Sequence, residues 1–161
     1  MVMDITAHNN QLPPPAFTFH GQYTRSVDAK GRFNLPFRFR KGGPDTGDER
    51  YVVMRGPDGG LTVHPHAVWI EAYNRLRSGP PSPELRRNLR RMSLHSRMVE
   101  PDSQGRIAVP VELLGTVGIQ KKILVVGVGN YMELWNPESL MDEGDADATA
   151  LDAGFQDEFF R

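Results

Sequence analysis

The chain has 161 residues and a formal net charge of −1, and it contains no cysteine, which excludes disulfides, thiolate metal ligands and a cysteine nucleophile. The charge is uneven: residues 138–161 hold eight acidic residues and one basic residue, which leaves 18 lysines and arginines against 12 aspartates and glutamates before them. No apolar run approaches the roughly 18 residues of a membrane span, and no signal peptide pattern is present, so we expect a cytoplasmic protein without membrane contact.

The N-terminal segment is polar and proline-rich, and we expect residues 1–18 to be a disordered extension. A strand is predicted over residues 16–27, followed by the stretch 28–36, which reads Asp-Ala-Lys-Gly-Arg-Phe-Asn-Leu-Pro. The same pattern, Asp-x-x-Gly-Arg-apolar-x-apolar-Pro, returns 74 positions later over residues 102–110. We interpret the pair as an internal repeat.

Each residue type in the repeated stretch has a local role. Asp28 and Asp102 are predicted to set turns by accepting backbone N–H groups, and Gly31 and Gly105 to supply a positive φ. The apolar pair that follows shares one face of a short strand, and the proline ends that strand and begins a helix. The arginine of each copy lies where the turn becomes strand. It is either a structural partner of its own aspartate or a ligand contact, and the local pattern leaves both open.

The remaining elements follow the same order in each half, with an offset of 72 in the later part. The first half is predicted to contain a short helix after Pro36, a strand at 51–54, a turn at 56–60, a return strand at 61–64 and a helix from Pro65. The second half is predicted to contain a short helix at 110–114, a strand at 123–126, a turn at 127–130 and a return strand at 132–135. Between the halves, Ser82 is predicted to cap a further helix. Because neither half has enough strands for a stable sheet, we predict a mainly β fold with peripheral helices (α+β), a pseudo-twofold β-barrel in which the halves interleave.

The sequence offers little for catalysis. It has no Gly-x-Ser-x-Gly elbow, and His64 and His66 stand without an acidic cluster. Gly127-x-Gly129 lacks the third glycine and the long helix of a dinucleotide fingerprint, and it is better explained as a hairpin turn. We therefore predict that the protein is not an enzyme and has no metal site and no cofactor.

Basic residues carry the remaining chemistry. Five of them cluster on the two motif turns and the helices that follow, and paired basic loops suit phosphates and the edges of guanine bases. These candidate DNA-binding residues are Lys30, Arg32, Arg38, Arg40 and Arg106. A second group covers one side of the helix after Ser82, where a solvated face and a face that binds a polyanion or an acidic protein surface remain open, and the near-absence of acidic partners after Glu84 slightly favours the latter. That group is Arg86, Arg87, Arg90 and Arg91. In the acidic tail, Phe155, Phe159 and Phe160 are candidate anchors for a partner protein.

The motifs resemble the MraZ family of bacterial transcription regulators, which are built from two AbrB-like (SpoVT-AbrB) repeats. The residues that carry the resemblance are Gly21-x-Tyr23, Asp28-x-Lys30-Gly31-Arg32-x-x-x-Pro36-x-x-Phe39-Arg40, Gly56-x-Asp58-Gly59-x-Leu61, Asp102-x-x-Gly105-Arg106-x-x-x-Pro110 and Val125-Val126-Gly127-x-Gly129-Asn130-x-x-Glu133-x-Trp135. It divides the chain into the extension, a first AbrB-like repeat (19–77), a connecting arginine-rich helix (78–95), a second repeat (96–141) and an acidic tail (142–161).

The resemblance implies a swapped-hairpin β-barrel and a ring-shaped homo-oligomer associated with the nucleoid. It also implies sequence-specific binding to short repeats in double-stranded promoter DNA, with repression of the protein's own division and cell-wall operon. Lys30, Arg32, Arg40 and Arg106 would contact DNA. Because Gln104 and Leu114 replace the second-half counterparts of Lys30 and Arg40, we expect the first half to dominate phosphate contact. The alternative is an assembly module without a nucleic-acid role.

Overall fold

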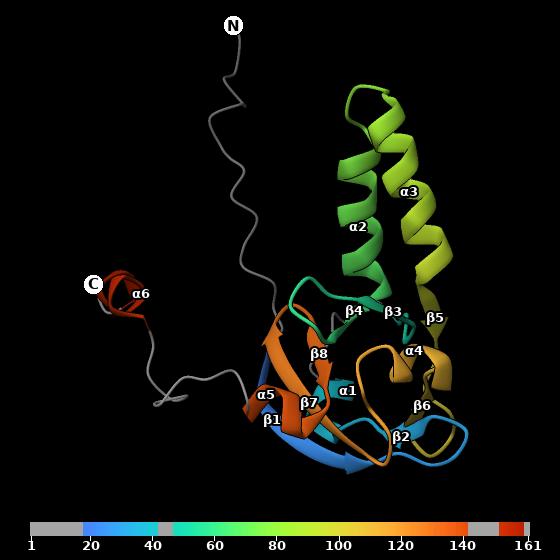
Figure 1. Ribbon diagram of the computed structural model, residues 1–161, viewed down its shortest axis with the longest axis vertical. Coiled ribbons are helices and arrows are strands. Elements are labelled where there is room, and N and C mark those ends of the chain that lie inside the picture. The colour runs from blue at the N-terminus through green and yellow to red at the C-terminus, as the bar shows by residue number, and fades with distance from the viewer. Residues whose placement is uncertain (1–17, 42–46, 142–151, 160–161) are drawn as a thin grey trace, which may run out of the picture.

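The computed structural model describes residues 18–41, 47–141 and 152–159 (Figure 1). The predicted extension up to residue 17, the segment 142–151 and Phe160 lie outside these ranges. The strands are β1 (Phe19–Ser26), β2 (Arg32–Asn34), β3 (Tyr51–Arg55), β4 (Leu61–Pro65), β5 (Arg97–Val99), β6 (Arg106–Ala108), β7 (Lys122–Gly129) and β8 (Met132–Trp135). The helices are α1 (Phe37–Lys41), α2 (His66–Arg77), α3 (Pro83–His95), α4 (Val111–Gly115), α5 (Pro137–Met141) and α6 (Ala153–Phe159).

The larger sheet joins strands from the two halves of the chain. Its order is β1-β7-β8-β4-β3-β5, and every neighbouring pair is antiparallel. The first strand of each half pairs with the hairpin of the other half, β1 with β7 and β5 with β3. Replacing each strand by its counterpart in the other half returns the same order read backwards. The sheet therefore has a pseudo-twofold topology in which the repeats are interleaved.

The motif strands form a smaller sheet of their own. β2 and β6 pair with Phe33 opposite Ile107. Both are three residues long and are closely followed by Pro36 and Pro110, whose nitrogens cannot donate to a ladder. Within the ranges described, the strands thus pair as two sheets and do not close into one hydrogen-bonded barrel. The predicted α+β class is confirmed, and the closed barrel is corrected to two sheets on a common core.

Alternation of side chains explains how that core forms. In β1 every second residue faces inward, from Phe19 to Arg25, while the residues between are exposed. The apolar pairs of both motif strands are at most 2% exposed, as predicted from their spacing. Phe39 of α1 packs edge-on against Phe19 and Tyr23, with ring centroids 5.7 and 5.3 Å apart, so α1 is held on β1.

Helices α2 and α3 form a hairpin that projects from β3, β4 and β5, away from the end that carries β2 and β6 (Figure 1). Helix α3 begins as predicted, because Ser82 Oγ accepts a hydrogen bond from the Leu85 N–H at 3.0 Å. Pro65 was predicted to be the first residue of a helix, but it ends β4 and α2 begins at His66. Helix α5 begins at Pro137, 71 positions after His66, whereas an offset of 72 was predicted. The offset changes because the two hairpin turns differ in length. No helix within the described ranges is long and apolar enough to cross a membrane.

Candidate nucleic-acid interface

The first motif turn is built around the Asp28 carboxylate. Its Oδ1 accepts hydrogen bonds from the backbone N–H groups of Lys30 and Arg32, both at 2.9 Å. Gly31 adopts φ +77°, and its N–H donates to the Asp28 carbonyl at 3.0 Å. The Arg32 N–H lowers the pKa of the Asp28 carboxyl, and the Arg32 side chain and the Lys30 N–H add to this effect. The turn is thus stabilised by an ionised aspartate.

The second motif turn repeats these contacts. Asp102 Oδ1 accepts from the N–H groups of Gln104 and Arg106 at 2.9 Å, and Gly105 again has φ +77°. The pKa of Asp102 is lowered as well, chiefly by the Arg106 N–H. The turn-setting roles predicted for the aspartates and glycines correspond to these contacts, and the two turns are the same structure built twice.

Both motif arginines pair with the aspartate of their own turn. The distance from Arg32 Nε to Asp28 Oδ2 is 2.7 Å, and that from Arg106 Nε to Asp102 Oδ2 is 2.9 Å. The arginine side chains stay 35% and 28% exposed. Among the described residues, neither guanidinium makes a hydrogen bond through its terminal nitrogens. The two interpretations left open by the sequence are therefore compatible, because the aspartate fixes Nε and leaves the outer edge of each guanidinium available.

Hydrogen bonds of the small sheet connect the two turns. Beyond the β2–β6 ladder, the Leu35 N–H donates to the Gly105 carbonyl at 3.1 Å, and the Val109 N–H donates to the Gly31 carbonyl at 3.0 Å. Each turn glycine thus accepts a hydrogen bond from the strand end of the other half. The two arginines are the first residues of β2 and β6 and are consequently carried on one hydrogen-bonded unit.

Arg40 lies at the second turn, although it belongs to the first repeat. Its guanidinium occupies the space that a Cβ on Gly105 would fill, and it also lies over the Phe37 ring, 5.5 Å from the centroid. Its counterpart Leu114 lies beside Gly31 and is buried, but there the Val109 carbonyl occupies the space that a Cβ would fill. The structure therefore divides the predicted cations between the turns, with Lys30 and Arg32 on the first and Arg40 and Arg106 on the second. Three of these four cations belong to the first repeat by sequence, although Arg40 lies at the turn of the second.

The other predicted cations lie on helices. Arg38 is exposed on α1. The four arginines of α3 are exposed too, but their helix belongs to the hairpin that projects away from β2 and β6 (Figure 1). They do not join the motif turns in one surface of the same molecule.

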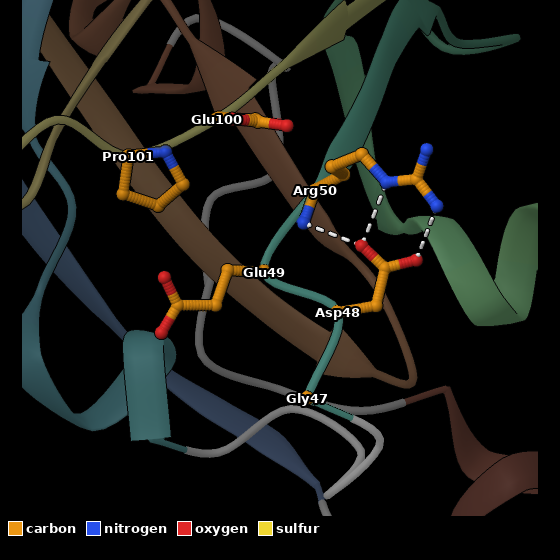
Figure 2. A pocket seen from close by; sticks show the side chains of 6 residues that line it. All are labelled: Gly47, Asp48, Glu49, Arg50, Glu100 and Pro101. Atoms are coloured by element: carbon orange, nitrogen blue, oxygen red, sulfur yellow. Dashed lines mark hydrogen bonds and ion pairs between the residues drawn. The ribbon is translucent and has the colours of Figure 1, made fainter.

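A polar hollow of about 500 Å³ beside β3 does not contribute to this interface (Figure 2). Arg50 binds both carboxylate oxygens of Asp48, with Nε–Oδ1 and Nη2–Oδ2 distances of 2.8 and 2.9 Å, and His66 Nδ1 lies 2.9 Å from Oδ2. These contacts hold the pKa of Asp48 far below its usual range, with the Arg50 side chain as the main cause. Because Glu49 and Glu100 also line the hollow, it is unsuited to a polyanion.

The Asp48 contacts form a clamp that fixes the start of β3 to the start of α2, and no sequence motif indicates it. Its three residues are scattered over a polar loop and a helix start. No group of three or more histidine, aspartate or glutamate residues suited to a metal ion occurs among the residues described.

Fold and site together define a class of α+β proteins made of two interleaved repeats, each presenting an arginine on an aspartate-stabilised turn. The family model for the MraZ protein matches residues 92–142. The chain is 38% identical over 122 residues to the transcriptional regulator MraZ of Thermomicrobium roseum, covering 75% of this chain and 83% of the relative. It is 37% identical over 120 residues to that of Lachnoclostridium phytofermentans, covering 74% and 82%. The corresponding protein of Thioalkalivibrio sulfidiphilus is 34% identical over 128 residues, covering 79% and 85%. The chain belongs to the MraZ family of transcriptional regulators, as the motifs predicted, and this is not a family of enzymes.

Proposed function

We propose that this protein regulates transcription by binding double-stranded DNA through its two motif turns. The observation that carries the proposal is the matched pair of arginines, each held through Nε and each with its terminal nitrogens unbonded in the described structure. Such a guanidinium suits bidentate contact with guanine O6 and N7, which supplies sequence specificity. Membership of a family of transcriptional regulators supports the same conclusion.

The surrounding cations have a different task in this proposal. Lys30, Arg38 and Arg40 are exposed near the turns and would neutralise phosphates, which positions the protein without reading sequence. DNA is the partner class because each motif turn carries two cations and its only carboxylate is already bound to an arginine.

We also propose that the protein acts at the nucleoid as a ring-shaped homo-oligomer on short promoter repeats, repressing its own division and cell-wall operon. One subunit offers few contacts, and several subunits on repeated sites can gain about 10²–10⁴ in avidity. Exposed Phe37 and its counterpart Val111, at 64% and 46%, are apolar residues available for assembly. An assembly role without nucleic acid is the alternative.

The experiment measures fluorescence anisotropy of the full chain with DNA from upstream of its own gene and with a scrambled fragment of equal length. We expect Arg32→Ala and Arg106→Ala each to weaken specific binding about 5- to 150-fold, since a bidentate base contact contributes roughly 1–3 kcal/mol. Arg86→Ala, which removes the same charge from α3, is the matched control and should change affinity less than about 2-fold.

Arg32→Lys separates charge from geometry. It should retain binding to the scrambled fragment and lose preference for the promoter, because lysine cannot bond a base edge with a planar fork. Equal binding of both fragments by the wild type, together with normal oligomerisation, would support the assembly alternative. Undiminished binding by Arg32→Ala would contradict the proposed contact.

A further inference from the structure

The arginine-rich face of α3 is not used by the proposed DNA interface. Arg86, Arg87, Arg90 and Arg91 are all exposed, and none of them forms a salt bridge within the described part of the chain. A helical face with four unpaired cations attracts an anionic partner. The question is which partner the neighbouring surface fits.

A groove of about 490 Å³ lies beside this face, between α2, α3 and β3. It is lined by Met54, Arg55, Leu76, Asn88, Arg91, Met92 and His95. Three of these residues are apolar, two are arginines and none carries a carboxylate. Leu76 is 44% exposed although it is a large apolar residue. The groove therefore suits a ligand that is both apolar and acidic, and methionine pairs favourably with aromatic rings.

The chain itself carries a segment with this chemistry. Phe155 and Phe159 lie four residues apart on α6, stack with centroids 6.3 Å apart, and are 58% and 69% exposed. The sequence from residue 138 onward holds eight acidic residues and one basic residue. An amphipathic helix that lays apolar residues into a groove is a common mode of recognition.

We propose that α6 docks in this groove of its own chain, with Phe155 and Phe159 among Met54, Leu76 and Met92. Glu158 then faces the arginines of α3. The tail thereby neutralises the one strongly cationic surface that the motif turns do not use. Docked α6 restricts DNA to the motif turns, because a bare arginine face would otherwise hold DNA without regard to sequence.

The connection sets how far α6 can reach from α5. Ten residues, 142–151, separate α5 from Asp152, and ten extended residues span at most about 33–36 Å. Where a tether of this length spans the gap, it gives a local concentration in the millimolar range, which favours the same chain over a free neighbouring copy.

Cysteine cross-linking of the full chain tests the proposal without background from native thiols, since the protein contains no cysteine. The test variant combines Asn88→Cys, in the groove, with Glu158→Cys on α6. The matched control combines Gln22→Cys with Glu158→Cys, because Gln22 is exposed on β1 and lines neither the groove nor the arginine face of α3. We expect the Asn88 pair to oxidise at least about 10-fold faster and to give a product of monomer size.

Two further variants test the contacts. Phe155→Ala combined with Phe159→Ala should reduce the rate of the Asn88 pair to that of the control, and Arg91→Glu should slow it while leaving the circular dichroism spectrum unchanged. Equal rates for the two cysteine pairs would overturn the proposal. A product of dimer size would overturn docking within one chain, and an unaltered rate after removal of both phenylalanines would overturn their insertion.

Discussion

Arg32 and Arg106 show how one side chain combines a structural contact with an exposed functional edge. Each donates through Nε to the aspartate that also holds the turn backbone, so the orientation of the guanidinium is fixed by the turn. A charge-assisted hydrogen bond of this kind is stronger than a neutral one and restricts the rotamer. The entropy of ordering the arginine is therefore lost during folding, before any ligand arrives.

We expect the stability of the two turns to depend on pH in the acidic range. Hydrogen bonds from Arg32 and Arg106 lower the folded-state pKa of Asp28 and Asp102 below the ordinary value of 3.8. Their contribution is therefore fully present above about pH 4–5 and is lost as the pH falls through the lower folded-state values. Urea unfolding between pH 7 and pH 2.5 measures this loss.

Asp28→Asn combined with Asp102→Asn provides the comparison. At pH 7 the double variant should be less stable than the wild type, and the difference should shrink below about pH 4, where the wild-type carboxylates become protonated. Some acid sensitivity remains in the variant, because Asp48 is also held ionised. A constant difference down to pH 2.5 would show that the turns do not titrate as described.

At the level of elements, each motif turn is covered by the helix of the opposite half. Leu114 of α4 lies beside Gly31, and Arg40 of α1 lies against Gly105. The backbone geometry is the same in both places, but the covering side chain is buried and apolar in one and exposed and charged in the other. The two turns are thus equal in shape and unequal in what surrounds them.

This inequality predicts different costs for the same substitution. Both glycines have φ +77°, where alanine is strained by about 1–3 kcal/mol. A Cβ on Gly31 would also meet the carbonyl of Val109, which is fixed by the small sheet, whereas a Cβ on Gly105 would meet the flexible end of Arg40. We expect Gly31→Ala to reduce the free energy of unfolding by about 1–3 kcal/mol more than Gly105→Ala, since overpacking adds to the strain.

Chemical denaturation of the two variants decides this point. Gly105→Ala combined with Arg40→Ala is the control, and it should recover only the steric part of the loss at Gly105. Equal losses for the two glycine variants would contradict the close approach of Gly31 to Val109.

At the scale of the whole molecule, charge is sorted between separate regions. The motif turns carry cations at one end, α3 of the projecting hairpin carries four exposed arginines, and the tail carries most of the excess acid (Figure 1). A net charge of −1 conceals this arrangement. Binding of a polyanion depends on the local field and not on the total charge.

The division of cations between the turns predicts how DNA binding responds to salt. The log–log slope is near −0.9 per phosphate neutralised. We expect Lys30→Ala and Arg40→Ala each to reduce the magnitude of the slope by about one per engaged subunit, because each residue serves a different turn. Affinity titrations from about 50 to 200 mM salt provide the measurement, with Arg87→Ala on α3 as the charge-matched control. A reduction for Lys30→Ala alone would contradict a phosphate contact by Arg40 at the second turn.

Much of this fold could be predicted because its signals are local. The repeat fixed the order of elements, and Asp28 and Gly31 act within five residues, where a sequence pattern carries the geometry. The neighbours of Arg40 could not be predicted, since its contact with Gly105 exists only because the halves interleave. The Asp48–Arg50–His66 clamp was missed because its members are joined only when the loop before β3 meets α2. The predicted barrel is not formed by one continuous sheet, because the three-residue strands β2 and β6 pair with each other and not with the six-stranded sheet.

The exchange of first strands between the halves also has a consequence for biosynthesis. Phe19 pairs with Gly129, so the first strand leaves the ribosome long before its partner has been made. At translation rates of about 5–20 residues per second, that delay is roughly 5–20 s. During this time the apolar face of β1 has no sheet to join, and the nascent chain depends on chaperones or on transient local structure. The interleaved architecture that carries both arginines on one unit thus delays completion of the sheet and exposes the nascent chain to aggregation during synthesis.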